Sequence, residues 1–258
     1  MPELPDVEGF RRRLARHGAG RRIREIEVLD AGVVRNTRPA TLRRLLEGRR
    51  LASPERRGKW LLAPTDGPTL LLHFGMTGSL EWNAESHRHD RVVLRLEGGE
   101  LRYRDQRKLQ GLWLAHDDEE AAAIMGCQGP DALGLRKAEL RERIAAKRTG
   151  IKTALMDQTV VAGLGNMISD EVLWRAHLHP GRRPGSLTSA EWDRLHRGLG
   201  TVLRAAVKEG RVPPRPSWLT GVRDEDHPAC PRCGTQLRRT KSGGRTTLWC
   251  PACQPSPG

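Results

Sequence analysis

The chain contains 258 residues, 37% of them hydrophobic, with a mean hydropathy of -0.60; this allows one large domain or two small ones and excludes repeated membrane spans. Its 45 Lys and Arg residues outnumber 31 Asp and Glu, which leaves a formal net charge of +14 and a sequence pI near 10.6. Because such a charge attracts polyanions, nucleic acid is the expected partner, with a generally solvated basic surface as the alternative.

The first half of the chain alternates short apolar runs with Gly, Pro and charged residues. A helix is expected first, because Val7, Phe10 and Leu14 recur on one helical face and Gly18 follows them. Runs of strand length then lie at 22–29, 59–63, 69–74, 92–96 and 101–104. The pattern predicts a β-rich domain that carries one N-terminal helix.

The second half changes to a helical period. Helices are predicted over 140–146, 151–156, 168–177 and 190–209, and Gly210 with the Pro-rich stretch after it ends the last of them. We therefore predict a two-domain α+β protein. Its expected parts are an N-terminal domain over 1–127, a linker over 128–139, a helical domain over 140–224 and a Cys-rich module over 225–254.

A glycine-containing loop separates the second and third predicted helices. Gly163 and Gly165 remove side-chain bulk there, and Asn166 is suited to N-cap the following helix. Backbone amides at such a helix start can bind an anion. An ordinary helical hairpin would need the same glycines, so the loop alone leaves both interpretations open.

The Cys-rich module contains two Cys-x-x-Cys pairs separated by sixteen residues, Cys230 with Cys233 and Cys250 with Cys253. This spacing is typical of a four-thiolate zinc ribbon, and a closed set of four ligands indicates one structural zinc ion. Two redox dithiols or disulfides are the alternative. Cys127 lies outside the set and is expected to be an inert core thiol.

Basic residues surround the Gly243-Gly244 turn between the two Cys pairs. Arg238, Arg239, Lys241 and Arg245 could contact a nucleic-acid backbone from such a hairpin. A solvated turn is the alternative, because many zinc ribbons bind protein.

The chain begins Met1-Pro2-Glu3. Removal of the initiator Met would expose the secondary amine of Pro2, and a terminal amine titrates near pH 8, so part of it is unprotonated at neutral pH. Such an amine can attack an electrophilic carbon and form an iminium, with Glu3 able to transfer protons. The alternative is a common Met-Pro start followed by acids that cap a helix.

Several segments occurring in order resemble the bacterial formamidopyrimidine-DNA glycosylase and endonuclease VIII family. They cover nearly the whole chain and end with the zinc hairpin. The matching segments are Met1-Pro-Glu-Leu-Pro-Asp-Val-Glu8, Arg57-Gly-Lys-Trp-Leu-Leu62, His73-Phe-Gly-Met-Thr-Gly78, Leu101-Arg-Tyr-Arg-Asp-Gln-Arg-Lys-Leu109, Ile151-Lys-Thr-Ala-Leu-Met-Asp-Gln158 and Val160–Asn166.

The resemblance implies a β-sandwich with an N-terminal helix, followed by a helix–two-turn–helix domain with a zinc finger, and DNA in the cleft between the domains. Family members flip a damaged nucleotide out of the duplex, cut its glycosidic bond and then cleave the strand by elimination. Matched by position, Pro2 would attack the sugar C1′, Glu3 would act as general acid and base, and Lys59 would contact a phosphate at the catalytic site.

The resemblance also implies a set of DNA-binding residues. Met76 matches the residue that fills the gap left by the flipped base, with a core position as the alternative, while Arg107 and Leu109 match positions that read and wedge the opposite strand. The full set is His73, Met76, Arg107, Leu109, Lys152, Asn166 and Arg245.

Three features depart from the formamidopyrimidine branch. Leu109 replaces the usual Phe, Asp6 replaces the usual Glu, and residues 210–229 are too short for the loop that caps oxidised guanine. Leu4 favours the formamidopyrimidine branch, whereas the absent cap favours endonuclease VIII and its oxidised pyrimidines. The lesion preference therefore stays open between the two.

The sequence thus predicts a cytoplasmic, nucleoid-associated DNA glycosylase and abasic-site lyase that acts as a monomer on duplex DNA with damaged bases or abasic sites. One structural Zn²⁺ is expected, without a redox or nucleotide cofactor and without a membrane partner. A non-catalytic zinc-ribbon protein that recognises damaged or bent DNA is the alternative, and an RNA-associated zinc-ribbon protein is a third possibility.

Overall fold

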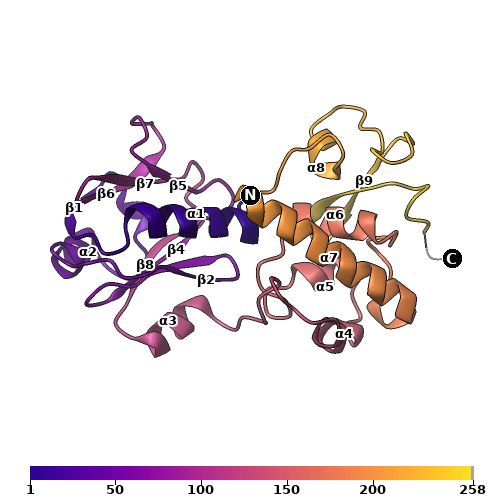
Figure 1. The fold of residues 1–258 in the computed structure, drawn as a ribbon, viewed down its shortest axis with the longest axis horizontal. Coiled ribbons are helices and arrows are strands. Elements are labelled where there is room, and N and C mark those ends of the chain that lie inside the picture. The colour runs from indigo at the N-terminus through magenta and orange to yellow at the C-terminus, as the bar shows by residue number, and fades with distance from the viewer. Residues whose placement is uncertain (257–258) are drawn as a thin grey trace. The chain divides into compact units, whose positions relative to one another are not determined.

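The computed structural model describes residues 1–256 and divides into two compact units, Met1–Cys127 and a second that begins at Gln128 (Figure 1). The first unit contains most of the strands and the second contains most of the helices. No helix among the described residues is both long enough and apolar enough to span a bilayer. The predicted mixed α+β class is confirmed.

Two antiparallel sheets of four strands form the first unit. One sheet has the order β1-β6-β7-β5, with bounds Ile23–Val28, Asp90–Leu96, Gly99–Arg104 and Ser79–Trp82. The other has the order β2-β3-β4-β8, with bounds Glu55–Arg57, Trp60–Ala63, Thr69–His73 and Gly111–Ala115. The predicted β-sandwich is therefore confirmed.

The core of the sandwich uses alternate residues of both sheets. Val92, Leu94 and Leu96 of β6 and Leu70 and Leu72 of β4 belong to one buried cluster. The intervening residues of the second sheet are also buried, because helix α3 (Asp118–Met125) packs with them in a separate cluster of Trp60, Leu62, Leu71, Ala115, Ala121 and Met125. An apolar layer on both faces explains why strand β3 shows no alternation of polar residues.

Helix α1 (Leu4–His17) contacts strands of both sheets, namely β5, β2 and β3. Its buried face includes Leu4, Val7 and Leu14, and Gly18 caps its C-terminus, as the sequence predicts. Helix α2 (Pro39–Leu46) and a 3-10 turn (Ala31–Val33) complete the unit. The N-terminal residues are thus held by an amphipathic helix on a rigid sandwich.

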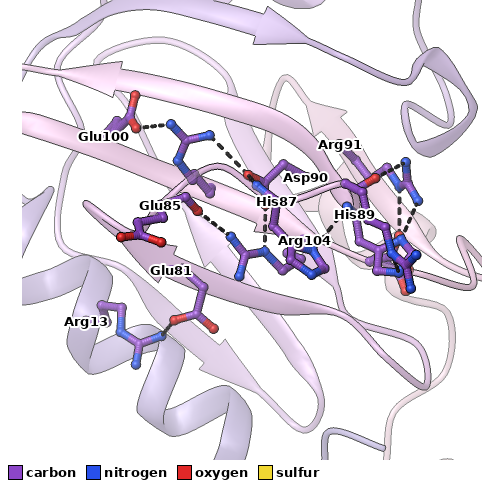
Figure 2. Close-up of polar contacts among 12 residues, drawn as sticks. Arg13, Glu81, Glu85, His87, His89, Asp90, Arg91, Glu100 and Arg104 are labelled. Carbon is purple, nitrogen blue, oxygen red and sulfur yellow. Dashed lines mark hydrogen bonds and ion pairs between the residues drawn. The ribbon is translucent and has the colours of Figure 1, made fainter.

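The start of strand β6 carries a buried carboxylate. Asp90 is 4% exposed and accepts hydrogen bonds from Arg102 at 3.0 Å, Arg104 at 2.6 Å and the backbone N–H of His87 at 2.9 Å. Figure 2 shows the cluster, in which Arg104 also donates to the carbonyl of Glu85 at 2.9 Å. Burial raises the pKa of Asp90, but the arginines and the His87 amide bring it below its ordinary value. This ionised carboxylate fastens the β5–β6 connection to β7.

The second unit is built on helices α4 (Lys137–Ala145), α5 (Ile151–Met156), α6 (Asn166–Arg175) and α7 (Ser189–Glu209). They correspond to the four predicted helices, with ends that differ by a few residues. Thr188 and Glu191 form a capping box at the start of α7, and Gly210 ends it with a left-handed φ of 67°. A 3-10 turn (Pro184–Ser186) precedes α7, and the short helix α8 (Leu219–Val222) follows it.

The Cys-rich module contains a two-stranded hairpin of β9 (Arg238–Ser242) and β10 (Arg245–Trp249) that packs on α6. Its buried cluster includes Trp174, Leu219, Leu237 and Leu248 together with Cys230 and Cys250. Cys127 does not belong to a core and is exposed, which corrects its expected core position. It follows Gly126, the glycine that caps the C-terminus of α3 with a φ of 67°.

Candidate catalytic and nucleic-acid-binding sites

The amino terminus is fixed by the first turn of α1. Glu3 is the N-cap residue and is 0% exposed, and it forms a capping box with Asp6. The Asp6 carboxylate accepts the backbone N–H of Glu3 at 2.8 Å. Pro2 is partly exposed immediately before this turn. The capping box therefore fixes the backbone that joins the two expected catalytic residues.

A buried ionic cluster connects α1 with the turn that carries Lys59. Glu8 accepts hydrogen bonds from Arg11 at 2.8 Å and from Arg56 at 3.3 Å. Burial raises the pKa of Glu8, but its hydrogen bond with Arg11 and the nearby arginine charges bring it below its ordinary value. Arg56 also donates to the carbonyl of Gly58 at 3.0 Å, next to Lys59. The β2–β3 turn is thus tied to helix α1, which Glu3 caps.

His73 ends strand β4 opposite Trp60, the residue that follows Lys59. The two rings meet edge to face with centroids 4.9 Å apart, and the His73 Nδ1 accepts the backbone N–H of Gly75 at 3.1 Å. Burial, together with the charge of Lys59, lowers the pKa of His73 to about 4. His73 is therefore a neutral imidazole at physiological pH and can contact a phosphate only as a hydrogen-bond donor.

Three of the expected DNA-binding residues lie on two loops of the first unit. Met76 is partly exposed, and its sulfur lies 3.0 Å from an Arg107 guanidinium nitrogen. The backbone N–H of Arg107 donates to the Thr77 hydroxyl at 3.1 Å, which joins the loops. Leu109 is 50% exposed. This exposure leaves the side chain accessible to bases, as the expected wedge position requires.

Asn166 lies beside the zinc hairpin, although its expected capping role is wrong. Gly165 is the N-cap residue of α6, and Asn166 is the first residue of the helix. Its side-chain N–H donates instead to the carbonyl of Thr246 at 2.9 Å. Arg245, the neighbour of Thr246, is exposed at the start of β10. The structure therefore brings these two expected phosphate-binding positions to one region of the second unit.

The expected phosphate contact of Lys152 is corrected. Lys152 is 0% exposed, and its ammonium lies 2.7 Å from an Asp170 oxygen and 2.8 Å from the Thr247 hydroxyl. A fully buried, ion-paired ammonium cannot reach DNA without breaking this pair. The motif that contains Lys152 gave no sign of the burial, because its partners lie on other elements. The sequence likewise gave no sign that Asp170 pairs with Arg223, at 2.7 Å.

The four cysteines of the Cys-x-x-Cys pairs fit one zinc ion. All four sulfurs lie within 4.8 Å of one another. Representative separations are 3.6 Å for Cys233 and Cys250 and 3.9 Å for Cys230 and Cys253. Tetrahedral bonds of about 2.3 Å place sulfurs about 3.8 Å apart, so the cluster has the size of a Zn²⁺ site. Four thiolates leave no ligand position for water, which indicates a structural ion.

Neighbouring groups also suit thiolate ligands. The indole N–H of Trp174 on α6 donates to the Cys230 sulfur at 3.3 Å, and the backbone N–H of Cys253 donates to the Cys250 sulfur at 3.4 Å. Donors of this kind orient the ligands of a metal and stabilise their negative charge. The predicted structural zinc ion is therefore confirmed as the group that the cluster fits.

Three family models match the chain in the order of its elements. The formamidopyrimidine-DNA glycosylase N-terminal domain matches residues 1–112, and the H2TH domain of the same enzyme matches residues 128–213. The zinc finger found in formamidopyrimidine-DNA glycosylase and isoleucyl-tRNA synthetase matches residues 229–255. The last match includes all four cysteines.

Curated relatives match over the full length. A formamidopyrimidine-DNA glycosylase of Symbiobacterium thermophilum is 41% identical, with 100% of this chain and 90% of the relative covered. That of Desulfitobacterium hafniense strain DCB-2 is 36% identical, with 98% and 100% covered.

Solved structures give the same result. The Lactococcus lactis formamidopyrimidine-DNA glycosylase bound non-covalently to DNA with an abasic site has a TM-score of 0.85 at 30% identity, covering 98% of this chain and 100% of that one. A mutant of that enzyme in complex with DNA containing a ring-opened guanine (Fapy-dG) has a TM-score of 0.88 at 30% identity, covering 99% and 100%. From its motifs, its two-unit fold and these full-length matches, the chain belongs to the formamidopyrimidine-DNA glycosylase family.

Proposed function

We propose that the protein is a base-excision repair DNA glycosylase that also cleaves the DNA strand at the resulting abasic site. Its substrate is duplex DNA with an oxidised or ring-opened base. Family membership supports the glycosylase activity, and the fixed geometry of Pro2 and Glu3 at the start of α1 supports the additional lyase step. That geometry is the single observation on which the proposed chemistry depends.

In the proposed reaction the unprotonated amine of a processed Pro2 attacks C1′ of the damaged nucleotide. A bond forms between the proline nitrogen and C1′, the bond from C1′ to the base breaks, and the base leaves with a proton. The single N–H proton of the secondary amine is the one that leaves with the base, and Glu3 then protonates the ring oxygen so that the sugar ring opens to give an iminium. Removal of a C2′ proton expels the 3′-phosphate, and water finally releases the proline.

Burial suits Glu3 to this role. Its side chain is 0% exposed, so bulk water does not compete with the substrate for the carboxyl group. The capping box keeps its backbone fixed next to Pro2, so the donor does not need to be ordered when substrate binds.

We further propose that exposed or loop residues of both units bind the DNA. Met76, Arg107 and Leu109 would fill and wedge the duplex around the flipped nucleotide, and Lys59, His73, Asn166 and Arg245 would bind phosphates. Flipping costs a few kcal/mol of stacking and pairing, which these contacts must offset.

Reductive trapping tests the lyase step. Borohydride should convert the iminium into a stable covalent adduct on a duplex with an abasic site, and mass spectrometry should place the adduct on Pro2 after loss of Met1. Pro2→Gly should trap far less DNA and release less base, while Glu3→Gln should reduce excision more than binding.

The same experiment separates the alternatives. A retained Met1, or an adduct on a lysine, contradicts the chemistry proposed for Pro2. Binding of lesion DNA without trapping or base release by the unmodified protein would support the non-catalytic alternative instead.

A further inference from the structure

A buried carboxylate of the second unit joins its own helix to three other parts of the chain. Asp170 on α6 has a side chain that is 1% exposed. It pairs with Lys152 of α5 at 2.7 Å and with Arg223, which follows α8, at 2.7 Å. It also accepts the backbone N–H of Leu248 in β10 at 3.1 Å. The side chain of Asp170 therefore links helices α5 and α6, the segment after α7 and the zinc hairpin.

The carbonyl oxygen of Thr246 is the second meeting point. It accepts hydrogen bonds from Lys152 at 3.3 Å, Asn166 at 2.9 Å and Arg223 at 2.9 Å. Arg223 contributes to both meeting points because its guanidinium donates to Asp170 through one terminal nitrogen and to Thr246 through the other. The peptide that follows Arg245 is therefore held by donors from α5, α6 and the α8 segment.

The turn of the hairpin also rests on helix α5. A side chain at Gly243 would lie 3.3 Å from Thr153, and the φ of 54° at this glycine disfavours other residues. The zinc ligands lie at the other end of the hairpin, because Cys250 comes five residues after Arg245, about 16 Å along an extended strand. Zinc therefore cannot fix the orientation of Arg245 by direct coordination.

We propose that Asp170 and Arg223 are positioning residues that hold the Arg245 end of the hairpin beside Asn166, in the arrangement that binds a DNA phosphate. The proposal rests on the DNA-binding function proposed above and names residues that the family motifs do not. Neither residue needs to touch DNA, because Asp170 is buried and Arg223 uses both terminal nitrogens within the protein.

Arg223→Lys is the sharper test variant. A lysine keeps the positive charge beside Asp170 but presents one ammonium in place of a planar fork, so it cannot reproduce the two-point contact. Asp170→Asn is the complementary variant, because it keeps the shape and removes the charge that pairs with Lys152 and Arg223. Arg197→Lys and Asp193→Asn, which are changes of the same kind on the surface of α7, serve as matched controls.

The measurements are zinc content per chain and affinity for a duplex with a tetrahydrofuran abasic-site analogue over a range of salt concentrations. We expect Arg223→Lys to retain one zinc ion, to bind the duplex on the order of tenfold more weakly, and to lose about one unit of salt slope, as for one lost phosphate contact. In the otherwise unmodified protein, Arg245→Gln should weaken binding of the duplex by a similar factor. In the Arg223→Lys background the same change should weaken binding little further, because the effects of coupled residues are not additive.

Unchanged affinity of Arg223→Lys with full zinc content would overturn the proposal, as would fully additive losses with Arg245→Gln. If Asp170→Asn loses zinc or unfolds, the decision rests on Arg223→Lys alone. If the unmodified protein does not prefer the lesion duplex to an undamaged one, the proposed function fails first, which is a separate result.

Discussion

The carboxylate of Asp6 accepts a hydrogen bond from the backbone N–H of Glu3 at 2.8 Å and so closes the first turn of α1. Asp6 is one methylene shorter than the usual Glu of the family, so the sequence places a shortened carboxylate near the expected catalytic end. The structure shows that the shorter side chain still reaches the N-cap amide. The substitution therefore preserves the backbone next to Pro2.

Asp6→Ala should destabilise the first unit by about 1 kcal/mol, since loss of a helix cap costs about this much. The rate of base excision should fall by more than this loss of stability explains, because the backbone N–H of Glu3 loses its hydrogen bond to Asp6. Thermal unfolding and single-turnover base release measure the two effects. Asp6→Glu is the matched control and should retain both, whereas full activity of Asp6→Ala would mean that the cap does not position Glu3.

His73 should make the first unit sensitive to acid. Its pKa falls from an ordinary 6.5 to about 4 in the folded state, so the folded protein binds the proton less readily than the unfolded chain does. The free energy of unfolding is therefore at its full value above pH 6.5. It decreases as the pH falls towards 4, by at most about 3 kcal/mol. Urea unfolding between pH 7 and pH 4 measures this loss.

Replacement of the ring tests the assignment to His73. His73→Gln should flatten the decline in unfolding free energy below pH 6.5, although it starts from a lower stability at pH 7. His116 is exposed in the same unit, and His116→Gln should leave the slope unchanged. If both variants follow the slope of the unmodified protein, another group causes the acid sensitivity.

Zinc removal should unfold the hairpin and leave the sandwich intact. Cys250→Ser, or a strong chelator, removes one of four thiolate ligands or the ion itself, and the binding energy of a structural zinc ion is folding energy for so small a module. We expect loss of the metal and loss of protection from hydrogen exchange in β9 and β10, with the strands of the first unit unchanged.

Cys127→Ser provides the control for this experiment. Cys127 is exposed and outside the cluster, so its variant should retain one zinc ion and full DNA affinity. Retention of zinc by Cys250→Ser, with normal exchange protection in the hairpin, would contradict the four-ligand assignment.

Local sequence signals predicted the elements that depend on local physics. The spacing of Val7, Phe10 and Leu14 gave helix α1, and the glycine at 210 gave the end of α7. Strand β2 (Glu55–Arg57) escaped prediction because all three of its residues are charged, and only pairing with β3 makes it a strand. Helix α3 is short, and its weak pattern becomes clear only beside the outer face of β3, β4 and β8.

The functional residues also divide into those that local sequence spacing identifies and those whose environment depends on distant parts of the chain. Each Cys-x-x-Cys pair is local, so the zinc ligands could be identified from spacing, and the order of motifs was enough to indicate the family. Lys152, by contrast, matched a DNA-binding position in the sequence and is buried against Asp170 in the structure. Gly165 takes the N-cap position that was expected of Asn166. The side-chain amide of Asn166 donates instead to the carbonyl of Thr246, eighty residues away in the chain.

The amino-acid sequence by itself determined the two-part α+β architecture, the zinc module and the family, because periodicity, capping and ligand spacing act over a few residues. Only the tertiary structure decided which polar side chains are buried. Desolvation and ion pairing depend on groups far apart in the chain, and these groups convert Lys152 into a buried cation and His73 into a neutral ring.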